Sequence, residues 1–453
     1  MPDADTFPLA FGQLSVWRVM EDWPLDRWSE TYLCTAVPVP DGCPRDRVIE
    51  AFGVLCERHE SLRTHFADTP QGPVQRVRPA ADPVEVSTVE CPGATKSEAE
   101  AVSRELTRER IDREGDFARR FTVVTDGDRA TYAVIVVDHI VADGFGLRRL
   151  CGELTALMGG DDPDGQQWLG ETPPQPSDLA LAQRSHANRA RREAAVGYWN
   201  RLLDTLPSHL FPVPDEAGNR PGRIEAVLRS PGARSALGRT SRRMSVPPQG
   251  ILLALNSLAT AVVTGTAQVV LTLQSSNRFT APWRSLVSSM NQYTPLPLDV
   301  SIAPDTFAQY AKHVQGGAFK AYRFGSYDID TVTTLVRAKR GIALGFDHFY
   351  NFMAHDVPTG PDIDVKANPD LRSRRIEVTR PKRQIGPRFD VKVHTGSDMP
   401  IFVRADPQLI PQPCLHALLA WYDEELHRLA DSGSNVSAML ARCAGAIGRH
   451  EAR

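Results

Sequence analysis

Along the first 160 residues, segments with apolar residues at every third or fourth position alternate with short, continuous apolar runs. The first kind of pattern predicts amphipathic helices, and the second predicts buried strands. The predicted helices are 44–60, 97–111 and 145–158. The predicted strands are 121–124 and 131–137, joined by a turn at 126–128. Ser97 and Glu100 form a capping-box pattern that favours a helix start at this point.

A stretch rich in Gly, Asp and Pro at 159–176 predicts a loop, and a polar helix is expected after it at 178–203. The second half repeats the alternation of helices and strands. Its predicted helices are 249–263 and 413–430, and its predicted strands are 268–275, 346–352, 388–394 and 399–404. This order predicts two α+β lobes, 1–177 and 178–453.

Composition narrows the class of protein. The chain has 453 residues, 42% hydrophobic and 24% charged, which is typical of a globular protein with a large core. A net charge of -3 gives no general reason to expect nucleic acid or an anionic membrane as partner. The seven cysteines are scattered without a Cys-x-x-Cys pair, which favours free thiols in a reducing compartment and no metal site.

Two further features favour a cytoplasmic protein. Residues 1–5 lack the basic and apolar regions of a secretory signal. The longest apolar helix candidate, 251–263, contains Asn256, Ser257 and Thr260 and is too short to cross a bilayer. We therefore expect no membrane association.

The segment Asp138–Gly144 carries the strongest sign of chemistry. It follows the buried strand predicted at 131–137, so His139 would stand at a strand tip, next to an Asp143-Gly144 turn. An imidazole titrates near neutral pH and can accept a proton during catalysis. A packed structural histidine at a strand end is the alternative interpretation.

The spacing His-x-x-x-Asp-Gly resembles the signature of nonribosomal peptide condensation domains, which is normally His-His-x-x-x-Asp-Gly. Asp138 replaces the first histidine here. Other segments resemble the family's motifs in the right order. They are 9–17 with Gln13 and Trp17, 58–66 with His59 and Arg63, Asp178–Ala180, Tyr198–Trp199, Asn277–Arg278, Val287–Leu296 and Arg388–Asp390. The resemblance is strong over the first 150 residues and weak after about residue 300.

This resemblance implies two similar lobes of the chloramphenicol-acetyltransferase type, arranged as a V around a central substrate tunnel. It implies an acyltransferase of natural-product biosynthesis that joins an acyl thioester to an amine or a hydroxyl. The expected partners are acyl or peptidyl carrier proteins and a small-molecule acceptor. The expected carrier of the substrate is a phosphopantetheine arm or coenzyme A, with no bound cofactor and no metal.

The resemblance also implies roles for individual residues. His139 is expected to accept or share the proton of the nucleophile. Gly144 allows a close backbone approach, and its N–H could donate to a developing oxyanion. Asp143 is expected to be structural and to pair with Arg278. Asp138 should point away from His139, because successive strand residues face opposite sides, and should be a buried acid that a backbone donor or an arginine satisfies.

Several alternatives stay open at this point. Because its first histidine is replaced, the chain could be a non-catalytic module that recruits other enzymes. It could also be an epimerase-type or a coenzyme A-dependent variant of the same fold. The basic run 372–383 is either a solvated loop or a dock for an acidic carrier or a phosphate, with Arg374 and Arg375 as the candidate contacts. The length leaves no room for an adenylation domain, so a free-standing enzyme or an excised domain is expected.

Overall fold

The computed structural model describes residues 5–80, 82–160, 168–206, 222–353, 373–394 and 396–451. The chain divides into two compact units. Unit 1 consists of Met1–Val196, Ser276–Gln292 and Ser326–Thr331, and unit 2 consists of Gly197–Ser275, Tyr293–Gly325 and Val332–Arg453. Each unit combines helices with at least one sheet, so the predicted α+β class is confirmed. The boundary between residues 177 and 178 stays a prediction; unit 1 runs on to Val196 and adds two later segments.

Unit 1 contains two sheets. One has the strand order β2-β7-β6-β5, and the other has the order β1-β4-β3. The strands are β1 (Asp5–Pro8), β2 (Leu33–Pro38), β3 (Thr64–Ala67), β4 (Val74–Val77), β5 (Ser87–Glu90), β6 (Arg119–Asp126) and β7 (Arg129–Val137). Residues 133–137 of β7 are completely buried, which explains why this strand reads as a continuous apolar run. Its carboxyl end leads directly into the candidate site.

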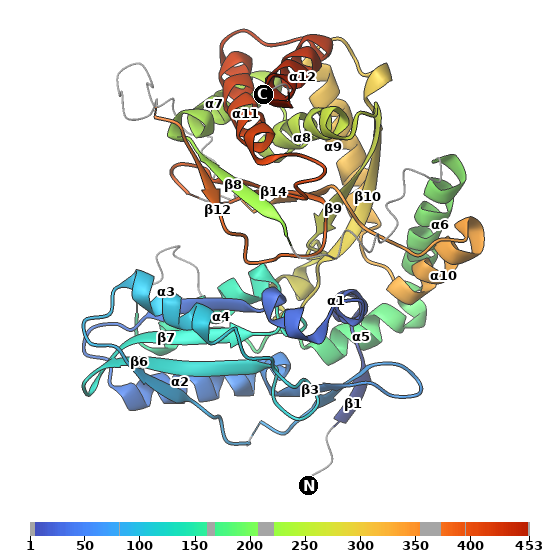
Figure 1. The fold of residues 1–453 in the computed structure, drawn as a ribbon. Coiled ribbons are helices and arrows are strands. Elements are labelled where there is room, and N and C mark those ends of the chain that lie inside the picture. The colour runs from blue at the N-terminus through green and yellow to red at the C-terminus, as the bar shows by residue number, and fades with distance from the viewer. Residues whose placement is uncertain are drawn as a thin grey trace. The chain divides into compact units, whose positions relative to one another are not determined.

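The helices of unit 1 pack on the four-stranded sheet and beside it. They are α1 (Phe11–Glu21), α2 (Arg45–Arg58), α3 (Lys96–Glu105), α4 (Gly144–Leu157) and α5 (Pro176–Arg184), with short 3-10 helices η1 (Leu25–Thr31), η2 (Glu60–Arg63), η3 (His186–Asn188) and η6 (Ala281–Ser285). Figure 1 shows α2 on one face of this sheet and α3 on the other. Phe52 of α2 stacks on Phe121 of β6 with ring centroids 4.3 Å apart, which joins helix to sheet.

Two predicted helices of this region have different bounds in the structure. The capping box is formed by Thr95 and Glu98, two residues earlier than expected, and α3 ends at Glu105 rather than near 111. The Arg120 guanidinium binds the carbonyls of Leu106 and Glu109, which stabilises the non-helical path after α3.

The single helix predicted at 178–203 is also interrupted. It is divided into α5 and α6 (Arg189–Thr205) by the extended backbone of Ser185. Arg192 donates to the carbonyls of Gln183 and Ser185, and the Asn188 amide donates to the carbonyl of Ala182. These side chains satisfy carbonyls near the break, so the interruption leaves them with hydrogen-bond partners.

Unit 2 is built on a seven-stranded sheet with the order β10-β9-β11-β13-β14-β8-β12. The strands are β8 (Ile224–Arg229), β9 (Gln268–Ser275), β10 (Gln292–Asp299), β11 (Phe349–Phe352), β12 (Arg375–Thr379), β13 (Phe389–Val393) and β14 (Ile401–Ala405). The strand expected from 346 begins only at Phe349. His348 before it has a left-handed backbone (φ 50°), and the Asp347 carboxylate accepts its N–H, so the backbone bends here before the strand begins.

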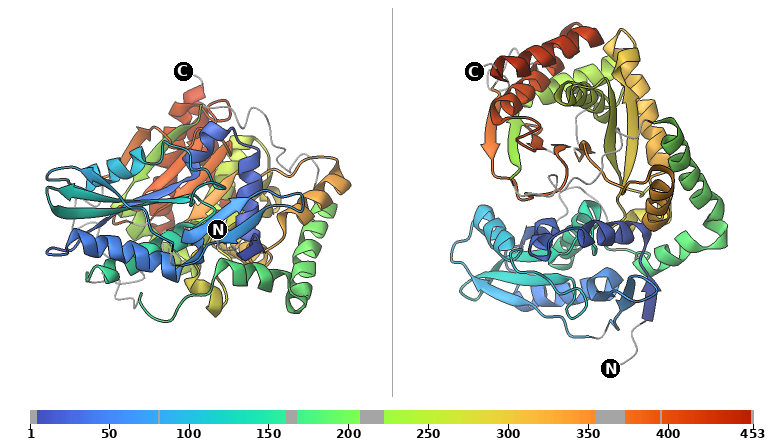
Figure 2. Two further views of the ribbon diagram at one scale, coloured as in Figure 1. Left: turned by 90° about the horizontal axis from the view of Figure 1, so that it is seen from below. Right: turned by 45° about the vertical axis from the view of Figure 1, so that its right-hand side comes forward.

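The helices of unit 2 are α7 (Pro231–Met244), α8 (Pro248–Thr264), α9 (Phe307–Arg323), α10 (Ile329–Arg340), α11 (Gln412–Asp431) and α12 (Val436–Glu451), with the 3-10 helix η7 (Val300–Ile302). α7, α8 and α11 lie on one face of the seven-stranded sheet, and the turned views show the same arrangement (Figure 2). The predictions of α8, β9, β13, β14 and α11 are confirmed to within about two residues at most of their ends.

The strongly apolar helix α8 belongs to the core of unit 2. Residues 250–261 of α8 are buried throughout. In the described part of the chain, no single helix is long and apolar enough to cross a membrane. Taken together, α7 and α8 have the length and apolar composition of a membrane span, but the two helices are bent against each other at the break between them.

Candidate active site

His139 occupies a tight turn that follows β7. The carbonyl of Asp138 accepts the N–H of Val141 at 3.0 Å, which closes the turn around His139. The residues on both sides, Asp138 and Ile140, are completely buried, while His139 itself is only partly buried. The fold thus fixes the backbone of this turn in the core and leaves His139 partly exposed.

Ser289 contacts the imidazole from a segment 150 residues further along the chain. Its Oγ lies 3.3 Å from His139 Nδ1 and 3.1 Å from Asn291 Oδ1. Ser289 is completely buried. The sequence analysis placed Ser289 in the motif-like segment 287–296 but missed this contact, because no local pattern joins residues 150 positions apart.

Asp143 begins α4 and is held on all sides. Its Oδ1 accepts the N–H of Gly146 at 2.9 Å and a proton of Arg278 Nη2 at 2.8 Å, and its Oδ2 accepts the N–H of Met290 at 3.2 Å. It is therefore the N-cap of α4 as well as the partner of a buried arginine. The structure brings together the two residues that the resemblance paired.

Arg278 organises the segment that carries Ser289. Besides Asp143, its guanidinium binds the carbonyl of Leu286 at 2.7 Å and that of Ser288 at 3.1 Å. Asn277 before it adopts a left-handed backbone (φ 54°), and its amide donates to the carbonyl of Met290. The pair Asn277-Arg278 therefore folds residues 286–290 into a fixed loop beside His139.

A glycine of the first motif allows this loop to pack closely. A Cβ atom on Gly12 of α1 would lie 2.3 Å from the carbonyl oxygen of Ser289 and 2.6 Å from the Cα of Met290. Only glycine leaves room for backbone at this distance. The motif at 9–17 thus contributes to the site by its shape.

Gly144 is the first residue of α4 and is exposed. A Cβ atom there would meet nothing within 4 Å. The N–H groups in the first turn of a helix have no partner within the helix, so the start of α4 presents partial positive charge. This is the property that a developing oxyanion requires of its neighbours.

Asp138 is completely buried and satisfied. Its carboxylate accepts two hydrogen bonds from Arg113, from Nε and Nη2, both at 2.8 Å, and a third from the N–H of Ile140 at 2.9 Å. The carboxylate is thus directed to Arg113, so the expected arginine partner of this buried acid is present.

His59 belongs to a buried network that joins α2 to α4. Its Nε2 lies 3.0 Å from Glu153 Oε2, and Arg58 and Arg149 bind the same carboxylate at 2.9 and 2.7 Å. Burial lowers the pKa of His59. Burial alone would raise the pKa of Glu153, but the contacts with His59 and the arginines hold it at about 2. This network anchors the helix that begins at the site and is structural.

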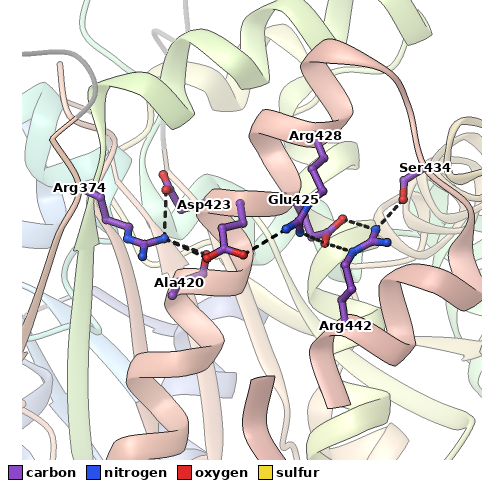
Figure 3. Close-up of polar contacts among 8 residues, drawn as sticks. Arg374, Ala420, Asp423, Glu425, Arg428, Ser434 and Arg442 are labelled. Atoms are coloured by element: carbon purple, nitrogen blue, oxygen red, sulfur yellow. Dashed lines mark hydrogen bonds and ion pairs between the residues drawn. The ribbon is translucent and has the colours of Figure 1, made fainter. Parts of the chain in front are cut away.

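The two arginines proposed for docking differ in their surroundings. Arg374 lies 3.5 Å from Asp423 and 3.4 Å from Glu424 of α11, so its charge is locally balanced (Figure 3). In the same region, Arg428 and Arg442 hold Glu425 at 2.8 and 2.6 Å, which joins α11 to α12. Arg375 opens the edge strand β12, is exposed, and faces Arg229 of β8 in register. Arg372 lies outside the described residues.

A second polar cluster that the sequence analysis missed lies in unit 2. Asp390 of β13 is buried between Lys392 and Arg404, each 3.2 Å from its Oδ2. Arg404 also binds the carbonyls of Arg383 and Ile385, which fixes the loop before β13. Among the described residues, no group of three His, Cys, Asp or Glu side chains is placed to hold a metal ion.

Known proteins resemble this chain in sequence and in fold. The family model for the condensation domain matches residues 25–375. The chain is 26% identical over 403 residues to the nonribosomal peptide synthetase kk1B of Curvularia clavata, which covers 86% of this chain and 3% of that protein. The chain spans 3–5% of the length of synthetases such as this one.

Two solved structures share the fold. The condensation domain from the Monacolin K polyketide synthase MokA has a TM-score of 0.74 at 17% identity, covering 96% of this chain and 99% of its own. A structure concerning condensation domain-mediated chain release from the enacyloxin polyketide synthase has a TM-score of 0.74 at 18% identity, covering 95% and 84%. At these identities the likeness concerns the fold alone.

Proposed function

Because this chain belongs to the condensation-domain family, we propose that it transfers an acyl group from a thioester to an amine or a hydroxyl. The observation that carries the proposal is the partly exposed His139, whose imidazole Ser289 contacts and which lies five residues before the amino end of α4. The donor is a carrier protein bearing a phosphopantetheine arm, or coenzyme A. The acceptor is a small molecule or a second carrier-bound substrate, and the product belongs to natural-product biosynthesis.

The reaction needs one proton acceptor and one site for negative charge. The nucleophile's nitrogen or oxygen attacks the thioester carbon, and its proton passes to His139 Nε2. The N–H of Gly144 and the start of α4 stabilise the oxyanion of the tetrahedral intermediate. Collapse breaks the carbon–sulfur bond, and the imidazolium returns the proton to the departing thiolate. No metal or bound cofactor takes part in this scheme.

The hydroxyl of Ser289 sets the tautomer that this scheme requires. A serine hydroxyl has one proton. When it donates that proton to Asn291 Oδ1, its oxygen accepts the proton of His139 Nδ1. The neutral imidazole then carries its lone pair on Nε2, where it can accept a proton from the nucleophile.

This arrangement predicts the effect of three substitutions. Ser289→Ala should lower kcat about tenfold, because the imidazole loses the partner that fixes its tautomer. Asn291→Asp should retain most of the activity, because a carboxylate is also an acceptor. Ser288→Ala is the matched control and should leave kcat unchanged. The hydroxyl of this adjacent residue is buried and has no hydrogen-bond partner among the described residues. The measurement is kcat. Equal losses in Ser289→Ala and Asn291→Asp would mean that the hydrogen bonds run the other way, with Ser289 donating to His139 Nδ1 and accepting from the Asn291 amide.

A second prediction concerns docking of the donor. We propose that Arg375, with Arg374 beside it, contributes to binding of an acidic carrier or a phosphate. Arg374→Gln with Arg375→Gln should raise the KM for the donor about tenfold at low salt and less at high salt. The acceptor's KM should not change. The control is the pair Arg104→Gln and Arg108→Gln, both well exposed in unit 1. An unchanged donor KM would remove this docking proposal.

The proposed function is tested with a panel of substrates. Purified protein is incubated with carrier-bound and coenzyme A-bound acyl thioesters together with amines and alcohols, and products are detected by mass spectrometry. An amide or ester that forms with wild-type protein and not with His139→Ala supports the proposal. If a folded protein gives no product from a broad panel, the function is recruitment or another reaction on the same fold.

A further inference from the structure

The most informative departure from the family pattern is Asp138, which stands where the signature normally has a histidine. In the structure this carboxylate is completely buried and accepts three hydrogen bonds. Two come from Arg113 in a side-on, bidentate geometry, the arrangement in which a guanidinium and a carboxylate pair most strongly. The substitution at residue 138 therefore comes with a built partner.

Arg113 is fixed independently of Asp138. Its guanidinium carbon lies 4.5 Å from the ring centre of Trp28 and 5.7 Å from that of Trp17. These distances are within the range of cation–π interactions. Its own carbonyl accepts the N–H of Phe66 at 2.8 Å, which attaches this segment to β3. Arg113 is only 3% exposed, so its charge is buried and needs a counterion.

The pair acts on His139 through the backbone. Asp138 Oδ1 accepts the N–H of Ile140, so the carboxylate reaches across His139 to the backbone of the residue that follows it. The carbonyl of Asp138 accepts the N–H of Val141. His139 is thus an inner residue of two overlapping turns that both depend on Asp138, and the side chain that sets one of them is held by Arg113.

We infer that Asp138 and Arg113 are a co-dependent pair of positioning residues that replaces the first histidine of the signature and aims the His139 imidazole. This inference rests on the proposed function. A histidine at residue 138 could accept the N–H of Ile140 only with an unprotonated nitrogen, and it would leave the Arg113 charge buried without a counterion. The two residues therefore work only together.

The test separates positioning from stability. Asp138→Asn keeps an acceptor for Ile140 but opposes an amide to Arg113, and should lower kcat at least tenfold with little change in KM. Asp138→Leu with Arg113→Met removes both charges, and buried pairs replaced by apolar residues often regain stability. This double variant should melt near the wild-type temperature, yet its kcat should remain at least tenfold below that of the wild-type protein.

A matched control and a direct probe complete the experiment. Glu153→Gln breaks another buried carboxylate–arginine network of unit 1, in which the partners of the carboxylate are Arg58, His59 and Arg149. It should lower the melting temperature, and because Asp138, Arg113 and the turn at His139 keep their contacts, kcat should fall much less than in the Asp138 variants. The probe is the ¹⁵N signal of the His139 ring in protein with labelled histidine, assigned with His139→Ala. It should move in both Asp138 variants and stay in place in Glu153→Gln.

The outcomes are distinct. Wild-type kcat and an unmoved His139 signal in the folded double variant would overturn the inference. So would an equal shift of the signal in Glu153→Gln, because the effect would then be general loosening. The ring signal needs no substrate, so it tests positioning even if the wild-type protein transfers no acyl group. Absence of acyl transfer by the wild-type protein would reject the proposed function, and the ring signal would still decide whether Asp138 and Arg113 position His139.

Discussion

Replacing His139 with glutamine should lower kcat about a thousandfold and change the KM of either substrate little. A positioned base contributes about 10²–10⁴ to a rate, and His139 is the titratable side chain that Ser289 holds in this scheme. The glutamine side chain can still hydrogen-bond to Ser289 but cannot take a proton. The measurement is the initial rate of product formation at saturating donor and acceptor.

Alanine at residue 139 is the companion variant. If His139 acts as a base, alanine and glutamine should lose similar amounts of activity, because neither accepts a proton. If His139 only positions the acceptor, glutamine should retain much more activity than alanine. A loss below tenfold in both variants would contradict general base catalysis by this residue.

Arg278→Met should lower the free energy of unfolding by about 3–5 kcal/mol, because it leaves the Asp143 carboxylate buried without its counterion. Both side chains are less than 10% exposed, and the arginine also binds the carbonyls of Leu286 and Ser288. Urea unfolding monitored by circular dichroism gives this quantity. We also expect loss of activity, since the loop that carries Ser289 would lose its anchor.

Two variants make the Arg278 prediction specific. Adding Asp143→Asn to Arg278→Met should recover part of the stability, because asparagine still caps α4 and carries no charge. Arg374→Met removes an ion pair whose arginine is 36% exposed and should change stability by less than about 1 kcal/mol. A loss of under 1 kcal/mol in Arg278→Met would contradict a structural role for the pair.

The local elements of the site could be predicted from sequence, because each depends on neighbouring residues. The run 131–137 is a buried strand, and Asp143-Gly144 begins a helix, as the apolar pattern and the capping preference indicate. The pairing of Asp143 with Arg278 came from the resemblance alone. No local pattern joins residues that are 135 positions apart.

The contacts that refine the site could not be predicted. Ser289 lies in the motif-like segment 287–296, but nothing in that segment indicates a contact with His139. Arg113 was not singled out at all, and only the folded chain brings it to Asp138. The break between α5 and α6 was missed for a similar reason. It depends on Arg192 and Asn188 binding carbonyls, which competes with the helical propensity of the segment.

Unit 1 is assembled from three separate stretches of the chain, which has a consequence for folding during synthesis. A ribosome adds about 5–20 residues per second, so Arg278 emerges roughly 7–27 seconds after Asp143. During that time the Asp143 carboxylate of the nascent unit 1 lacks its counterion. Unit 1 stays incomplete until Ser326–Thr331 has also been synthesised. Chimeric proteins joined between residues 197 and 275 would combine the Asp143 of one parent with the Arg278 loop of another. Swaps that carry Ser276–Gln292 and Ser326–Thr331 along with residues 1–196 should therefore fold better than swaps of the first 196 residues alone.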